Sequence, residues 1–237
     1  MESSLGRRSN TGYLAAREAQ VLTWLCARMP AFVVPDHLTV VALAGAFITF
    51  CGFAASGYNP GFLWVAGLGL VTNWFGDSLD GSLARYRGQA RARYGYFLDC
   101  MSDAFCCLMI MIGLGLSPYV HMEAALFSLA GYFMLCIFVF LNHHVNGVHK
   151  LSFLGCGPTE TRLSLIALTG LMLIYGPSHL LVFGHALSIY DLALIANGLL
   201  SIGVFLSLMM KGIEQLSVQD PAPVANQIVL AEARGCD

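Results

Sequence analysis

The composition of this 237-residue chain excludes an ordinary soluble domain. Hydrophobic residues make up 57% of the chain and charged residues 11%, and the mean hydropathy is +0.69. Soluble domains average about 45–50% apolar and about 25% charged residues, so most of this chain must face lipid or lie inside a helical bundle. The net charge of −2 provides no basic excess for binding nucleic acid, which excludes that class of partner.

The first predicted segment, residues 1–37, contains an amphipathic helix over 12–29. Its apolar residues recur at helical spacing on one face: Leu14, Val21, Leu22, Leu25 and Met29. Arg17 and Arg28 flank this face, Glu18 interrupts it, and Pro30 ends the helix. We expect this helix to lie at the surface of a membrane.

Six apolar runs follow, over 38–56, 61–76, 96–116, 124–141, 163–183 and 187–210. A helix that spans a bilayer needs about 20 residues, and the second run, although short, can continue as a helix beyond Asp77. Backbone groups in lipid must bond within their own segment, so the runs are predicted to be helices. The predicted fold class is therefore all-α, a polytopic membrane protein whose six transmembrane helices form a domain over 38–210.

The distribution of Lys and Arg predicts the orientation of these helices. All 12 basic residues lie within 1–37, 77–95, 142–162 or after residue 210, and the opposite loops contain none. Because positively charged loops stay cytoplasmic, both termini and the region around Asp77 are predicted to be cytoplasmic, at the inner membrane in a bacterium. Residues 211–237 lose the apolar periodicity and are predicted to form a mobile cytoplasmic tail.

An acidic pattern covers the end of the second predicted helix and the start of the third. It reads Asp77-x-x-Asp80-Gly81-x-x-Ala84-Arg85, then nine residues, then Gly95-x-x-x-Asp99-x-x-x-Asp103. At about 100° per residue, the carboxylates of each helix share one face. Two adjacent antiparallel helices can therefore direct four carboxylates toward one place near the cytoplasmic interface, and the small residues beside them leave room for a ligand.

Four clustered carboxylates beside a membrane cannot all stay ionised without compensation. Protonation or pairing with Arg85 and its neighbours would provide it, and single Asp residues at helix ends are often plain ion-pair partners. Two divalent cations, Mg²⁺ or Mn²⁺, would also match the charge and prefer oxygen ligands. Such a site favours displacement at phosphorus, and nearby basic residues would hold further phosphate charge: Arg85, Arg87, Arg91 and Arg93.

This pattern resembles the signature of the CDP-alcohol phosphatidyltransferase family in every fixed position. The resemblance extends to the six-helix plan and to Pro35-x-x-Leu38-Thr39, so it covers roughly residues 30–210. One departure is Asp36, where the family usually has Asn. The resemblance implies an integral-membrane transferase of phospholipid biosynthesis that moves a phospho-alcohol from a CDP-alcohol donor to an acceptor hydroxyl of a lipid or polyol, releases CMP, and forms a homodimer.

Carried over by position, the resemblance implies the roles of single residues. Two divalent cations, Mg²⁺ or Mn²⁺, would be held by Asp77, Asp80, Asp99 and Asp103. Asp103 would also be the general base, and a carboxylate within reach of the acceptor hydroxyl can accept its proton. The nucleotide would contact Asp77, Asp80, Thr39, Gly81, Ala84, Arg85 and Gly95. Candidate substrate contacts are Arg91, Arg93, Glu160 and Arg162.

Histidines and the segment before the fifth predicted helix allow two interpretations each. In that segment, Thr159 can cap the helix, while Glu160 and Arg162 can face the substrate cleft. The histidines at the end of the fourth helix favour interfacial anchoring over a soft-metal site: His143, His144 and His149. His37 can contact the nucleotide or cap its own loop.

Two other functional classes use similar residues. An intramembrane Mg²⁺-dependent prenyltransferase also uses Asp-rich motifs, but on well-separated helices. A small non-enzymatic transporter would place its acidic residues near the midplane of the bilayer. Within the family, either CDP-diacylglycerol reacts with a soluble alcohol, or a soluble CDP-alcohol reacts with a lipid hydroxyl. The context of Asp99 and the 157–160 segment slightly favour the second direction, which the sequence leaves open.

Overall fold

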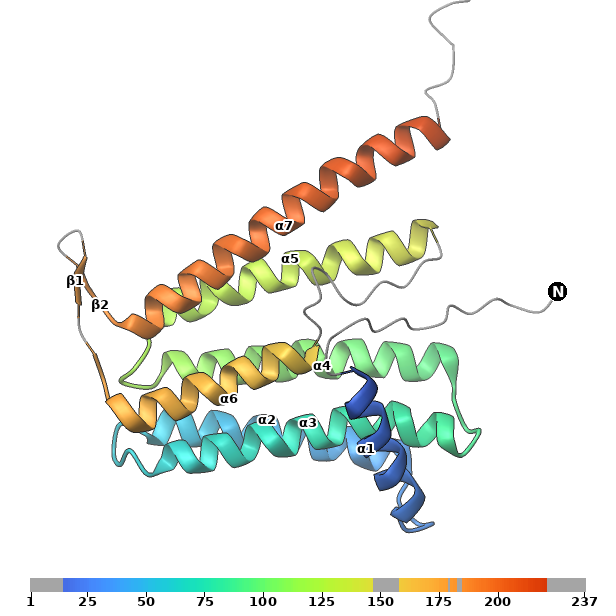
Figure 1. The fold of residues 1–237 in the computed structure, drawn as a ribbon, viewed down its shortest axis with the longest axis horizontal. Helices are drawn as coiled ribbons and strands as arrows, with labels where there is room; N and C mark the ends of the chain where they lie inside the picture. The colour runs from blue at the N-terminus through green and yellow to red at the C-terminus, as the bar shows by residue number, and fades with distance from the viewer. Residues whose placement is uncertain (1–14, 147–157, 179, 183–184, 221–237) are drawn as a thin grey trace, which may run out of the picture.

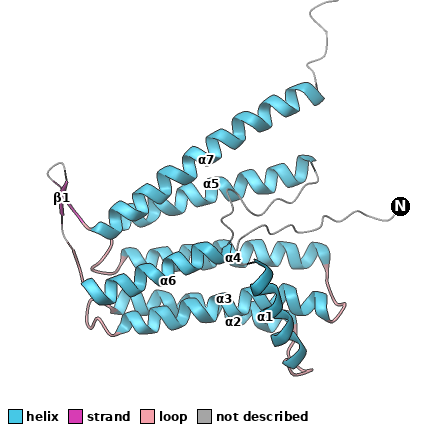
Figure 2. Cartoon of the chain, in the orientation of Figure 1, coloured by secondary structure: helices cyan, strands magenta, loops and turns pink. Residues whose placement is uncertain are grey.

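The computed structural model describes residues 15–146, 158–178, 180–182 and 185–220. In these ranges the chain is almost entirely helical (Figure 2). The elements in chain order are α1 (Ala15–Arg28), α2 (Pro35–Ala55), α3 (Phe62–Tyr86), α4 (Ala92–Gly115), α5 (Met122–Asn146), α6 (Pro158–Tyr175), β1 (Leu180–Val182), β2 (His185–Leu187) and α7 (Ile189–Gln219).

Helix α2 is the common support for the helices that carry the acidic pattern. Both α3 and α4 pack on α2, while α6 and α1 pack on α3 (Figure 1). Helix α5 packs on α4, and α7 packs on α5. The core of this bundle is apolar and includes Phe53 of α2, Leu63 of α3 and Leu114 of α4. The two halves of the acidic pattern are therefore positioned through α2.

Among the residues that the structure describes, four helices are long and apolar enough to cross a membrane: α2, α4, the 122–142 part of α5, and α7. Helix α3 is also long, but it carries Asn73 near its middle and Asp77 and Asp80 in its second half. In α6, the apolar stretch over 162–175 is shorter than a full span. Six spans were predicted, and the structure supports four of them.

The fifth predicted helix ends earlier than its apolar run indicates. Helix α6 stops at Tyr175, because Gly176 takes a left-handed conformation with φ of 69° and Pro177 follows it. A short antiparallel hairpin follows, in which Leu180 lies opposite Leu187. The all-α class is confirmed by the seven helices of the described residues, but the fifth apolar run, which was predicted as a helix to residue 183, forms strand β1 over Leu180–Val182 instead.

A buried carboxylate joins α7 to the turn before α5, at the end of the bundle beside the hairpin. Asp191 is fully buried, accepts hydrogen bonds from the backbone N–H groups of His121 and Ser188, each at 2.8 Å, and contacts His121 Nδ1 at 2.6 Å. In return, the Ser188 hydroxyl caps the Asp191 N–H at 3.0 Å. This network fixes where α7 begins.

Helix α7 extends into the segment predicted as a tail. It continues past residue 210 to Gln219, so the first nine residues of the predicted tail over 211–237 are helical. Glu214 and Gln215 are good helix formers, and apolar residues continue to alternate with them. Residues 221–237 lie outside the described residues.

Helix α1 packs across the outer side of α3. Its Leu22 and Cys26 are buried against Leu38, Leu79 and Leu83. This contact uses part of the apolar face that predicted a surface helix, and the remaining apolar side chains of α1 stay exposed, among them Trp24 at 54%. The helix itself is present, and its position at a membrane surface stays a prediction.

Candidate active site

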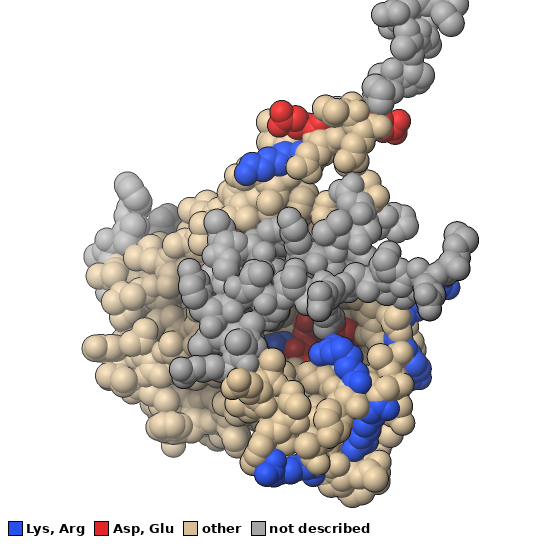
Figure 3. All heavy atoms as spheres, turned by 45° about the vertical axis from the view of Figure 1, so that its right-hand side comes forward, with Lys and Arg blue, Asp and Glu red and all other residues tan. Residues whose placement is uncertain are grey.

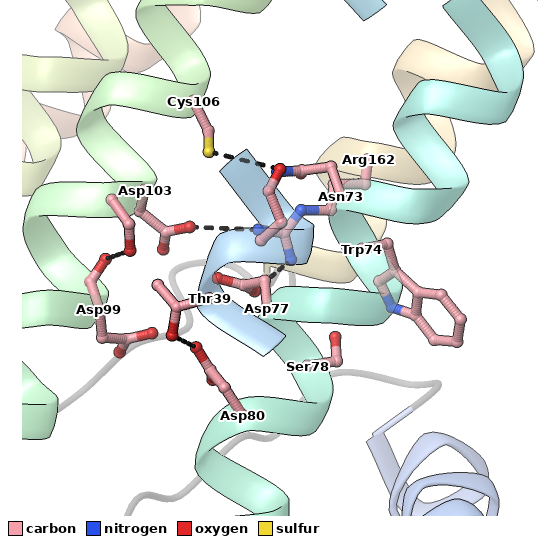
Figure 4. A network of polar contacts seen from close by, with 12 residues as sticks. Thr39, Asn73, Trp74, Asp77, Ser78, Asp80, Asp99, Asp103, Cys106 and Arg162 are labelled. Atoms are coloured by element: carbon pink, nitrogen blue, oxygen red, sulfur yellow. Dashed lines mark hydrogen bonds and ion pairs between the residues drawn. The ribbon is translucent and has the colours of Figure 1, made fainter. Parts of the chain in front are cut away.

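The acidic pattern occupies adjacent ends of α3 and α4 (Figure 4). On α3, Asp77 and Asp80 are three residues apart and share a face. On α4, Asp99 and Asp103 are four residues apart and do the same. The predicted meeting of two acidic helix faces is therefore present in the structure.

Three of the four carboxylates are close enough to share a cation. Three carboxylate oxygens lie within 4.8 Å of one another, one from each of Asp77, Asp99 and Asp103, and all three residues are partly buried. Three carboxylates converging from two helices suit a hard cation such as Mg²⁺ or Mn²⁺, which takes oxygen ligands.

Asp80 is held slightly apart from this group. The Thr39 hydroxyl of α2 donates to Asp80 Oδ2 at 2.7 Å, and the Gly81 N–H donates to Asp80 Oδ1. Asp80 still experiences the charges of Asp77 and Asp99. Its side chain is thus oriented by α2 at the edge of the cluster, and Thr39 is the residue that orients it.

Close backbone contact between α2 and α3 sets the position of Asp77. A Cβ atom added to Gly76 would lie 2.4 Å from the backbone nitrogen of Ala42, and the same contact recurs at Gly45, where it would lie 2.4 Å from the backbone nitrogen of Asn73. The Asn73 side-chain amide also donates to the Ala42 carbonyl at 3.0 Å. These contacts leave α3 little freedom to slide or rotate on α2.

Arg162 reaches the cluster from α6. Its guanidinium contacts Asp77 at 2.7 Å and Asp103 at 3.2 Å, with 15% of its side chain exposed. Arg162 therefore lies at the site with carboxylates as its partners, and its role as a substrate contact stays a prediction. The neighbouring candidate Glu160 and the three histidines over 143–149 have side chains outside the described residues.

The predicted nucleotide-contact residues border the cluster. Gly81 and Ala84 are partly exposed on α3, and Gly95 at the start of α4 has open space where a side chain would stand. Arg85 is exposed and donates to the Ser82 hydroxyl at 3.2 Å. Figure 3 shows acidic atoms within a recess whose border carries basic side chains. An anionic ligand would therefore meet positive charge before it reaches the carboxylates.

Two of the basic residues near the motif have structural partners. Arg91 Nη2 donates to both carboxylate oxygens of Asp36, at 2.9 and 3.0 Å, and the guanidinium stacks over Tyr94. Tyr94 also donates to Asp36 at 3.3 Å. Because Asp36 begins α2 and Arg91 precedes α4, this cluster links the two helix starts. Arg93 is exposed beside it.

Arg87 has a structural role that the sequence interpretation missed. Rather than facing phosphate, its guanidinium donates to backbone carbonyls at the end of α1 and in the following turn, including Met29 at 3.1 Å and Pro30 at 2.8 Å. A cation at the C-terminal end of a helix compensates the unpaired carbonyls there. Arg87 therefore attaches α1 to the end of α3.

Glu18 attaches the other end of α1. Its carboxylate accepts hydrogen bonds from Trp74 Nε1 at 3.2 Å and from the Ser78 hydroxyl at 3.4 Å, both on α3. The acidic residue that interrupts the apolar face of α1 is therefore a contact to α3. His37, the other undecided residue, accepts from the Val34 N–H at 3.5 Å, which is the capping alternative.

The sequence model of the CDP-alcohol phosphatidyltransferase family matches residues 32–211, which include the whole acidic pattern, Thr39 and Arg162. The chain belongs to the CDP-alcohol phosphatidyltransferase family. This CDP-alcohol phosphatidyltransferase is accordingly a membrane enzyme of phospholipid synthesis that transfers a phosphate-containing group from a CDP-alcohol donor to an alcohol acceptor. A comparison with curated proteins gives no match.

The family match agrees with the geometry of the cluster. Members of the family typically use a divalent metal, and the Asp77, Asp99 and Asp103 carboxylates of this CDP-alcohol phosphatidyltransferase could bind one. The match also favours the phosphotransferase interpretation over the prenyltransferase and transporter alternatives. The matched range begins a few residues before the predicted domain boundary at 38 and ends next to the boundary at 210.

Proposed function

We propose that this enzyme holds two divalent cations, Mg²⁺ or Mn²⁺, on Asp77, Asp80, Asp99 and Asp103, and transfers a phospho-alcohol from a CDP-alcohol with release of CMP. The observation that supports this proposal is the convergence of three carboxylates from two helices within 4.8 Å. When bound, the cations would neutralise the donor diphosphate and the charge that develops on the leaving oxygen.

Asp103 is the general base in this proposal. It accepts the proton of the acceptor hydroxyl as that oxygen forms its bond to the alcohol-bearing phosphorus and the bond from this phosphorus to CMP breaks. Its position supports the role, because Asp103 lies one turn beyond Asp99 on α4 and is partly exposed.

The remaining residues bind and orient the substrates. Thr39, Gly81, Ala84, Arg85 and Gly95 surround the nucleotide, and the open space at Gly95 lets a ligand approach the backbone closely. Arg91, Arg93, Glu160 and Arg162 are candidate contacts to the rest of the substrates. We also propose six transmembrane helices over 38–210, a cytoplasmic active site with both termini on that side, contacts with membrane lipids, and a homodimer.

Mass spectrometry of the products tests the proposed reaction. Purified protein in lipid nanodiscs is given CDP-diacylglycerol with soluble alcohols in one arm, and soluble CDP-alcohols with diacylglycerol in the other. We expect CMP and a new phospholipid in one arm with Mg²⁺ or Mn²⁺ present. The arm that reacts identifies whether the lipid is donor or acceptor, and failure of both arms with folded protein would contradict the proposal.

The Asp103→Asn variant tests the role of the base. We expect turnover to fall by about 10²–10⁴-fold, the usual contribution of general acid–base catalysis, while donor binding stays nearly unchanged. Asp220→Asn, at the exposed end of α7, is the matched control and should keep full turnover. Substantial turnover in Asp103→Asn with loss of nucleotide binding would mean that Asp103 is mainly a binding residue.

A further inference from the structure

Arg162 combines two properties that distinguish it from the other basic residues around the cluster. It comes from α6, outside the acidic pattern, and its guanidinium joins carboxylates of two different helices, Asp77 of α3 and Asp103 of α4 (Figure 4). Its side chain is only 15% exposed. A guanidinium keeps its charge under all ordinary conditions, so a positive charge is present inside the cluster even without a metal.

The two carboxylates that Arg162 contacts are also two of the three that could hold a cation. A divalent metal would need an oxygen of Asp77 and an oxygen of Asp103 at ligand distance, and these two carboxylates now accept N–H groups of the guanidinium at 2.7 and 3.2 Å. Two positive ions on one pair of carboxylates also repel each other strongly where water is partly excluded. Binding of the guanidinium to these carboxylates therefore weakens the binding of a divalent cation, and the cation weakens the binding of the guanidinium.

Without any cation, the cluster would be unfavourable. Asp77, Asp99 and Asp103 are partly buried within reach of one another, and like charges in such a place raise the free energy of the folded state. Removing one partner of a partly buried ion pair leaves the other uncompensated, which is strongly destabilising. Arg162 thus supplies the compensation that holds α3, α4 and α6 together at this end.

We propose that Arg162 is a built-in counter-ion that competes with the divalent cations for Asp77 and Asp103 and leaves these carboxylates when the cations bind. The inference rests on the proposed function, because it takes the cluster to be the metal site. The apparent dissociation constant for the metal is then the intrinsic constant divided by the fraction of molecules in which the guanidinium has left the carboxylates. The competition is reciprocal, so bound metal also releases Arg162.

Mn²⁺ binding to the full-length protein in detergent, without substrate, tests the proposal. Titration calorimetry compares the wild type with Arg162→Gln, Arg162→Lys and Arg28→Gln. The last removes a charge on the exposed side of α1, where Arg28 stacks on Trp24 away from the cluster. Thermal unfolding in EDTA is measured for the same four proteins.

In Arg162→Gln, we expect the dissociation constant for Mn²⁺ to fall about tenfold, equivalent to ~1.4 kcal/mol, and the unfolding temperature in EDTA to fall below that of the wild type. Arg162→Lys cannot bridge both carboxylates with one ammonium, so its constant should fall about threefold. Arg28→Gln should match the wild type in its dissociation constant for Mn²⁺.

Two results would overturn the inference. One is a dissociation constant in Arg162→Gln equal to or above that of the wild type. If Arg162→Gln does not fold, a constant in Arg162→Lys at or above the wild-type value has the same meaning. By contrast, a wild type that binds no Mn²⁺ at millimolar concentration would remove the metal site itself, and with it the proposed function, so the two failures are distinguishable.

Discussion

Substitution of Gly76 by alanine tests whether backbone contact between α2 and α3 positions the active site. The added Cβ would lie 2.4 Å from the Ala42 nitrogen and 2.5 Å from the Leu38 carbonyl oxygen, both of them backbone atoms of α2. Ordinary contact begins near 3.4 Å. Neither atom can turn away as a side chain could, so α2 and α3 must separate by about 1 Å at this level.

The separation acts directly on the acidic cluster. Gly76 precedes Asp77, and α2 also carries Thr39, which orients Asp80 at 2.7 Å. Overpacking of this kind costs about 1–3 kcal/mol, and misplacement of a catalytic group by about 1 Å can lower turnover by about 10²-fold. We therefore expect Gly76→Ala to lower both the unfolding temperature and the rate of CMP release.

Gly67→Ala is the matched control on the same helix. An added Cβ there meets nothing within 4 Å, and alanine favours a helix over glycine by about 1 kcal/mol. Thermal unfolding and CMP release are measured for both variants in the same detergent. Equal unfolding temperatures and equal turnover in the two variants would refute the argument that close approach at Gly76 positions Asp77.

Two further predictions concern residues that hold the site in place. Thr39→Val removes the hydroxyl that donates to Asp80, so the donor KM should rise roughly tenfold, as expected for a lost hydrogen bond to a charged group. Thr39→Ser should restore it, and an unchanged KM in Thr39→Val would contradict this role. Arg87→Gln leaves carbonyls at the end of α1 without donors and should lower the free energy of unfolding by about 1–3 kcal/mol. Lys211→Gln, at an exposed position, is the control and should not lower it. Equal unfolding temperatures in the two variants would contradict the role of Arg87.

The acidic cluster could be predicted because its residues lie close together in the sequence. Spacings of three and four residues place carboxylates on one helix face, and the short link between the helices brings the two faces together. The beginnings and ends of α2, α4 and α5 follow the apolar runs for the same reason, whereas α3 continues past its run to Tyr86. These predictions needed only the helical period and the length of each run.

Contacts between distant segments could not be predicted from the same pattern. Arg87 and Arg162 look alike in sequence, as basic residues near the end that is predicted to be cytoplasmic, yet one donates to carbonyls and the other to carboxylates. Their roles depend on where α1 and α6 pack against α3. Helical periodicity assigns a face to a residue, but it does not identify the element that covers this face.

A signal for the α2–α3 contact is nevertheless present in the sequence. Gly45 and Gly52 are seven residues apart on α2, and Gly69 and Gly76 are seven apart on α3. Seven residues are about two turns, so each pair lies on one face. In the structure, a Cβ at any of these four positions would be within 2.5 Å of the other helix. The spacing of small residues thus indicates which helix faces meet closely.

At the end of α6, by contrast, the apolar pattern of the sequence predicts the wrong structure. Its apolar run continues to residue 183, and hydropathy alone extends the helix to that point. Gly176 and Pro177 interrupt it, and the chain forms the hairpin of β1 and β2 instead. Local backbone chemistry therefore outweighs apolar composition at this position.

The dependence of CMP release on divalent cation is the most direct test of the central claim, that the carboxylates of Asp77, Asp99 and Asp103 form a metal site for transfer from a CDP-alcohol. Purified wild type and Asp99→Asn are assayed with a reactive CDP-alcohol and acceptor in EDTA, then with increasing Mg²⁺. We predict no release in EDTA, recovery with Mg²⁺ in the wild type, and a requirement for far more Mg²⁺, or no recovery, in Asp99→Asn. Equal release with and without Mg²⁺, or an unchanged Mg²⁺ dependence in Asp99→Asn, would contradict the claim.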